Sequence, residues 1–85
     1  MSIIWLFKTT DMEEKIKKVF AECLGVSDDI ITDSLEYASI PQWDSVAHMT
    51  VIVGLEDEFD IMIETDDVID MSSVTKAYEI IGKYL

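Results

Sequence analysis

The sequence predicts an all-α fold: a four-helix bundle with a long first loop and a short third helix. Apolar residues recur at helical spacing in separate segments, polar capping residues precede them, and no segment shows the alternation typical of strands. The chain has 85 residues, 49% of them hydrophobic and 28% charged, a composition typical of globular proteins. We therefore expect one domain over residues 1–85, with an extension over residues 1–9 and a core from about residue 10 onward.

The first helix is predicted over residues 11–24. Thr10 and Glu13 have the spacing of a capping box, in which each side chain bonds the backbone amide of the other residue. Gly25 is a natural stop. The apolar face is expected to consist of Met12, Ile16, Val19, Phe20 and Cys23.

The residues before Thr10 leave three possibilities open: they extend this helix, pack on the core, or are poorly ordered. Their apolar run, residues 2–7, is too short to span a bilayer. It also lacks the basic flank and the small-residue cleavage site of a signal peptide. We therefore expect a cytoplasmic protein.

A long loop over residues 26–43 follows the first helix, and long loops in small domains tend to be functional. Asp44 is the predicted cap of a second helix over residues 45–59. The residues expected to anchor the loop are Ile30, Ile31, Leu35 and Ile40. The apolar positions of the second helix are Val46, Met49, Ile52, Val53, Leu55 and Phe59.

Two more helices are predicted in the last third of the chain. The third is short, opening at Thr65 and ending near residue 69 or 70. Ser72 or Ser73 caps the fourth. The buried stripe of the fourth helix is expected to be Val74, Ala77, Tyr78, Ile81 and Tyr84.

The charge of the chain is strongly negative. Eighteen acidic residues against six lysines, with no arginine, give a formal net charge of −12. Nucleic acids and anionic membranes attract proteins through Lys and Arg, so nucleic acid is excluded as a partner and an anionic membrane surface is disfavoured, and we expect no membrane insertion. A positively charged protein partner is favoured instead, although acidity also keeps small proteins soluble. A single Cys and a single His can form neither an intrachain disulfide nor a four-ligand zinc site, and we expect no metal.

Ser45 stands on the first turn of the predicted second helix, directly after the long loop. Free amides and the helix dipole make such a position favourable for a phosphate, although an N-terminal serine is also common without any function. Asp44-Ser45-Val46 is followed by Leu-Glu-Asp-Glu-Phe at residues 55–59 and then by Ile63, Val68, Met71 and Val74. This string resembles the acyl carrier protein family, whose motif is Asp-Ser-Leu and whose second helix ends in Leu-Glu-Glu-Glu-Phe. The resemblance is continuous over residues 44–74 and looser over the flanking helices.

The resemblance implies that Ser45 carries a 4′-phosphopantetheine arm, transferred from coenzyme A by a phosphopantetheinyl transferase with Mg²⁺. Acyl intermediates would be held as thioesters on the terminal thiol. The chain would be a monomeric carrier domain and not an enzyme, serving fatty-acid, lipid or secondary-metabolite biosynthesis. Its partners would be the transferase, an acyl- or aminoacyl-loading ligase, and acyl-transfer enzymes with basic docking surfaces. Asp33-Ser34-Leu35 matches the motif literally, but Pro41 would break a helix that began there, so Ser45 is the predicted site.

Two further groups of residues are assigned hypotheses. The predicted docking surface combines an apolar part with acids that steer basic partners, and consists of Asp44, Val46, Met49, Val53, Glu56 and Asp57. The hypothetical acyl pocket consists of residues that could equally be core, namely Ile52, Ile63, Val68, Ile69 and Met71.

The chain departs from the family pattern in the second helix. Fatty-acid carriers usually place acids two and five residues after the serine, where this chain has Ala47 and Thr50. With Trp43 and His48, these departures predict a specialised carrier and not a housekeeping one.

Two other functions stay open, and two more are disfavoured. The chain could be an aminoacyl or peptidyl carrier, or an unmodified acidic adaptor that binds a basic protein. A calcium-binding module is disfavoured by the missing Asp-x-Asp-x-Asp-Gly spacing. An Asp-Ser-His hydrolase cluster is disfavoured because no oxyanion hole is evident, so His48 either packs on the loop or contacts the phosphate of the arm. Cys23 is interpreted as packing and not as the thiol that carries cargo.

Overall fold

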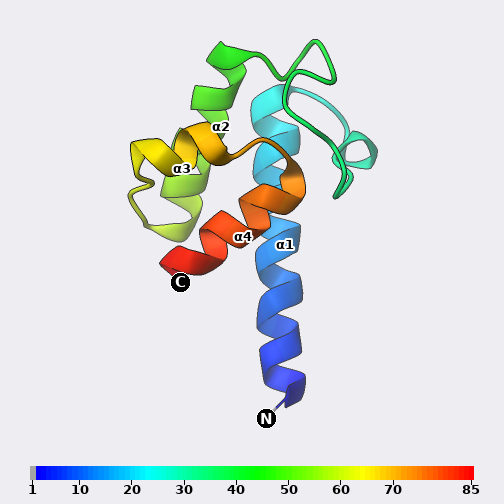
Figure 1. Cartoon of the computed structure of the whole chain (residues 1–85). Helices are drawn as coiled ribbons and strands as arrows, with labels where there is room; N and C mark the ends of the chain where they lie inside the picture. Colours follow the sequence, from blue (N-terminus) through cyan, green and yellow to red (C-terminus); the bar gives the residue numbers. More distant parts are fainter. Residues whose placement is uncertain (1) are drawn as a thin grey trace.

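The structure is a computed structural model that describes the backbone of residues 2–85 and the side chains of residues 11–85. Over this range it contains four α-helices, α1 (Ser2–Leu24), α2 (Ser45–Phe59), α3 (Thr65–Asp70) and α4 (Val74–Tyr84). A short 3₁₀-helix, η1 (Asp28–Ile30), lies in the long loop. Helices α2 and α4 both pack on α1, and α3 lies on the side of the molecule opposite the long loop (Figure 1). The predicted all-α fold is confirmed.

Helix α1 is longer than predicted. It begins at Ser2, so the start at residue 11 and the capping box at Thr10 are wrong. No glycine or proline interrupts residues 2–10, and the helix continues through them. Thr10 therefore lies inside the helix, where the backbone is already paired. The first part of α1 extends beyond the other three helices (Figure 1).

Local side-chain caps set the starts of α2 and α4, as predicted. Asp44 is the N-cap of α2, and its Oδ1 accepts a hydrogen bond from the Ala47 amide at 2.8 Å. Ser73 is the N-cap of α4, and its hydroxyl oxygen accepts from the Lys76 amide at 3.0 Å. Each cap satisfies an amide that has no partner within its own helix.

Helices α1 and α2 both end at a residue in the left-handed conformation. Gly25 has φ 69° and follows the last residue of α1, and the Val26 amide donates back to the Ala21 carbonyl at 3.1 Å. Asp60 has φ 54° and plays the same part after α2. The Gly25 stop was predicted, whereas the Asp60 stop was not, because aspartate adopts this conformation far less readily than glycine.

The core lies between α1, α2 and α4, and the loop contributes to it. Trp43 is fully buried although the sequence did not place it there. Of the predicted loop anchors, Ile31 is buried and two others are partly buried, but Ile30 is exposed because no residue of η1 faces the core. The buried apolar residues among residues 11–85 are Ile16, Val19, Phe20, Ala21, Leu24, Ile31, Trp43, Val51, Ile52, Leu55, Ile63, Met71, Val74, Ala77, Ile80 and Ile81.

The literal Asp-Ser-Leu sequence, residues 33–35, ties the long loop to α4. The Asp33 and Leu35 carbonyls accept hydrogen bonds from the Thr75 and Val74 amides at 3.1 and 3.0 Å. These are first-turn amides of α4, which need partners outside their helix. The Tyr78 hydroxyl also donates to Asp33 Oδ1 at 2.8 Å, which lowers the pKa of Asp33. Residues 33–35 therefore have a structural role in an irregular loop.

At Gly54, α2 lies close against α1. A Cβ placed there would lie 2.9 Å from both Cys23 Sγ and Val19 Cγ1. We expect Gly54→Ala to lower the free energy of unfolding by about 1–3 kcal/mol, because overpacking outweighs the better helix propensity of alanine. Urea unfolding measures this change.

The matched control is Gly82→Ala. Gly82 also lies inside a helix, α4, but a Cβ there would meet nothing within 4 Å. This variant should be neutral or more stable than the wild type by up to about 1 kcal/mol. A Gly54→Ala protein as stable as Gly82→Ala would contradict the close approach.

Candidate functional site

Ser45 is the first residue of α2, and its side chain is exposed. The long loop ends directly before Ser45, and the preceding residue, Asp44, is the N-cap that fixes where the helix begins. The His48 amide donates to the Asp44 carbonyl at 2.8 Å, which closes the first helical turn. The hydroxyl of Ser45 is therefore presented at the positive end of a 15-residue helix.

A cavity of about 330 Å³ opens beside Ser45. Its walls come from the loop, α2, α3 and the segment that follows α3. The lining residues are Tyr37, Ser45, His48, Met49, Val68, Ile69, Met71 and Ser72. Of the five residues assigned to an acyl pocket from the sequence, Val68, Ile69 and Met71 line this cavity. Ile52 and Ile63 do not line it, because they are buried in the core.

The residues assigned to a docking surface from the sequence differ in exposure and in structural role. Val46, Met49 and Val53 are exposed and recur along one side of α2, and we call them the apolar stripe. Asp57 is exposed at the end of the same helix, whereas Asp44 caps its start. Glu56 is partly buried, and its Oε2 accepts a hydrogen bond from the Ile63 amide at 2.9 Å. Its carboxylate therefore also holds the turn after α2.

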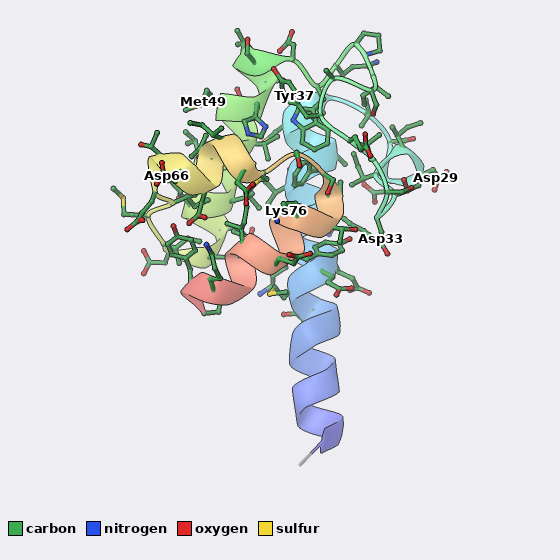
Figure 2. The ribbon with its side chains drawn as sticks, viewed as in Figure 1. Asp29, Asp33, Tyr37, Met49, Asp66 and Lys76 are labelled. Atoms are coloured by element: carbon green, nitrogen blue, oxygen red, sulfur yellow. The ribbon has the colours of Figure 1, made fainter. Side chains whose placement is uncertain are left out.

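Helix α3 also carries an exposed apolar residue, whereas the docking hypothesis from the sequence named only residues of α2 and its cap. Ile69 of α3 is 77% exposed and lies among Asp66, Asp67 and Asp70. Met49 of α2 and Asp66 of α3 lie on the same side of the molecule, away from Asp29 and Asp33 on the long loop (Figure 2). In the sequence, the available signal was an isoleucine with aspartates on both sides.

His48 is a buried polar residue, and it is the single one among residues 11–85. Trp43 Nε1 donates a hydrogen bond to His48 Nδ1 at 2.9 Å, and His48 Nε2 lies 2.9 Å from the Val68 carbonyl oxygen. The Tyr37 ring of the loop meets the imidazole edge to face at 5.4 Å. Both ring nitrogens are therefore occupied, and neither is free to take a proton from Ser45. This geometry favours the packing interpretation of His48 over a catalytic one.

Helix α3 is tied to α4 through Asp67. Lys83 Nζ lies 2.7 Å from Asp67 Oδ1, and the Tyr84 hydroxyl donates to Asp67 Oδ2 at 2.6 Å. These contacts, Lys83 first, lower the pKa of Asp67, and the same carboxylate raises the pKa of Tyr84 and of Lys83. The Tyr84 oxygen also accepts from the Glu64 amide at 2.9 Å. The last turn of α4 thereby fixes the start of α3.

The lowered pKa of Asp67 predicts a pH-dependent contribution to stability. A carboxylate whose pKa falls on folding stabilises the protein above its unfolded pKa of about 4, and this stabilisation is lost as the pH falls through the folded value. We expect Asp67→Asn to have a lower Tm than the wild type at pH 6, with the gap closing below about pH 4. Asp66→Asn removes the same charge from α3 without removing the bonds to α4, and it should show no such closing gap. A gap for Asp67→Asn that stays constant down to pH 2 would contradict the assignment.

Cys23 does not take part in this site. It lies on α1, where it is partly buried next to Gly54. Burial, followed by the nearby Glu22, raises the pKa of its thiol and so disfavours the reactive thiolate.

Within residues 2–85, no helix has both the length and the apolar character needed to cross a membrane. Among residues 11–85, no three His, Cys, Asp or Glu residues are arranged so that they could hold a metal ion.

Comparison with known proteins identifies the family. No protein-family model matches the chain. The acyl carrier protein of Buchnera aphidicola subsp. Baizongia pistaciae (strain Bp) is 32% identical to it over 75 residues, which cover 88% of this chain and 96% of that protein. Identity at this level over nearly the full length of both proteins agrees with the helical fold. The chain is a carrier protein and not an enzyme, and it belongs to the acyl carrier protein family.

Proposed function

We propose that Ser45 bears a 4′-phosphopantetheine group and that the chain, as a single monomeric domain, carries acyl intermediates on it. The position of Ser45 is the observation that carries this proposal. Its hydroxyl is exposed at the start of a long helix and borders an apolar cavity. Ser34, the alternative serine, lies in the long loop between Asp33 and Leu35, whose carbonyls accept hydrogen bonds from α4.

The residues around Ser45 fit such a group. The helix N-terminus favours the phosphate, and the Asp44 carboxylate is turned toward the Ala47 amide, which partly offsets its charge. The cavity offers apolar side chains from Met49, Val68 and Met71. When bound, the group supplies a thiol that holds acyl cargo as a thioester. The chain itself supplies position, shelter and recognition.

Recognition by partner enzymes is assigned to the apolar stripe and to the acids around it. Residues 45–55 of α2 carry no acid, so basic groups of a partner would meet Asp57 at the end of α2 and the acids of α3. The partners of this surface are a phosphopantetheinyl transferase, a loading ligase and acyl-transfer enzymes. The neutral first turns of α2 support a specialised pathway over housekeeping fatty-acid synthesis, and we expect this pathway to be cytoplasmic.

Loading of the full chain tests this proposal. The protein is incubated with coenzyme A, Mg²⁺ and a broad-specificity phosphopantetheinyl transferase, and its intact mass is measured. We expect one mass gain, equal to a single 4′-phosphopantetheine. No gain in a folded protein, repeated with an extract of the native host as the source of transferase, would contradict the proposal and favour the unmodified adaptor.

A further inference from the structure

Helix α3 is a weakly anchored wall of the cavity beside Ser45. None of its six residues, all within the described range, is fully buried, yet Val68 and Ile69 line the cavity. Its start is held through Asp67 by Tyr84 and Lys83 of α4. A short helix with so little buried surface depends on a few specific bonds for its position.

A hydrogen bond from α2 holds the other end of α3. The Val68 carbonyl is in the last turn, where carbonyls lack helical partners. In a continuing helix its partner would be the Ser72 amide, four residues later. That amide instead donates to the Asp70 carbonyl at 2.8 Å. Val68 is instead paired with His48 Nε2 at 2.9 Å. This bond joins α3 to the helix that bears Ser45.

The partners of His48 determine which of its nitrogens carries the proton. An indole N–H only donates, so His48 Nδ1 must accept the hydrogen bond from Trp43 Nε1. The neutral imidazole then carries its proton on Nε2 and donates it to the Val68 carbonyl. Trp43 is fully buried and packs against Phe20 of α1 at 5.1 Å. A continuous chain of contacts therefore runs from the core through His48 to α3.

We propose that His48 is a positioning residue that latches α3 to α2 and holds the α3 wall of the cavity beside Ser45 in place. The bond between Nε2 and the Val68 carbonyl is the latch, and the bond from Trp43 fixes the ring in the orientation that makes it. Breaking the latch leaves the end of α3 held by the exposed ion pair between Asp70 and Lys76, at 3.5 Å, and loosens the cavity wall formed by Val68 and Ile69. The consequence for acyl cargo rests on the proposed function: cargo is sheltered while the latch is closed and released when it opens.

Three substitutions separate the two bonds of His48. The amide nitrogen of glutamine reaches the position of Nε2, so His48→Gln keeps a donor for Val68. The shorter asparagine places its oxygen near Nδ1, so His48→Asn keeps an acceptor for Trp43 but not the latch, and His48→Phe keeps neither. A residue that only fills space would not order the variants in this way.

Hydrogen exchange on the unmodified full chain measures the latch. Relative to amides in the middle of α1, we expect those of α3 to exchange roughly five- to tenfold faster in His48→Asn and His48→Phe, the equivalent of one lost hydrogen bond. His48→Gln should stay close to the wild type. Equal acceleration in all three variants, or none in Asn and Phe, would overturn the latch.

A second measurement needs no substitution, so it does not depend on whether the variants fold. Nitrogen-15 NMR of the wild-type imidazole at neutral pH should show the Nε2-protonated tautomer with a slowly exchanging proton. The Nδ1-protonated tautomer, or a rapidly exchanging Nε2 proton, overturns the proposal. Both measurements use the protein before modification, so their failure leaves the modification of Ser45 standing. Failure to load Ser45 likewise leaves the latch result unchanged.

Discussion

Ser45→Ala will abolish the mass gain on incubation with coenzyme A and a phosphopantetheinyl transferase, whereas Ser34→Ala will be loaded like the wild type. Both serines follow an aspartate and precede an aliphatic residue, so the comparison isolates structural context. Ser45 stands exposed at the start of α2, and Ser34 lies in the loop segment that is tied to α4. Intact-mass spectrometry after the reaction gives an all-or-none result.

The fold of Ser45→Ala should be unchanged. The removed hydroxyl is on an exposed side chain, and the Asp44 cap with its bond to the Ala47 amide stays in place. We expect the free energy of unfolding to change by less than about 0.5 kcal/mol. Loading of Ser45→Ala, or loss of loading in a folded Ser34→Ala protein, would contradict the assignment of the site.

Trp43→Ala is expected to lower the free energy of unfolding by about 3–5 kcal/mol. The indole is fully buried, meets the Phe20 ring edge to face at 5.1 Å and donates to His48 Nδ1. Its removal leaves a large cavity at the point where the loop enters α2, together with an unpaired ring nitrogen. Such a loss is comparable to the whole stability of many small domains.

Trp43→Phe separates packing from hydrogen bonding. Phenylalanine keeps much of the aromatic surface against Phe20 and loses the N–H donor to His48. We expect a smaller loss, about 1–3 kcal/mol, measured like that of Trp43→Ala by urea unfolding. If Trp43→Ala cost no more than Trp43→Phe, Trp43 would not be the packing anchor that the structure shows.

The starts of α2 and α4 were predictable because their determinants are local. Asp44 and Ser73 each cap an amide three residues later, a pattern visible in the sequence alone. The same local logic failed for α1. The Thr10 and Glu13 pair has the spacing of a capping box, but such a cap forms only where a helix begins, and α1 already begins at Ser2.

The two sides of α2 could not be separated from the sequence. Apolar residues surround this helix, so periodicity did not show that Val51 is buried while Val46 and Val53 are exposed. Gly54 gave no signal either, because its role depends on how closely α1 approaches. Only the packing of α1 on one side of α2 decides which residues form the core and which form the apolar stripe.

The bond between His48 and Val68 joins residues twenty positions apart. It depends on how α3 is placed against α2, which no local pattern encodes. The sequence drew attention to His48 because it lies three residues after Ser45, and it suggested packing on the loop, which the contact with Tyr37 confirms. The attachment of a group at Ser45 rests on the motif and on the position of the serine, and it stays a prediction.

The central claim is tested most directly on protein isolated from its native host. Intact-mass measurement followed by fragmentation of the peptide that contains Ser45 would locate any modification. The account predicts a 4′-phosphopantetheine mass on Ser45 and an unmodified Ser34. A native protein with an unmodified Ser45, or with the group on another residue, would contradict it.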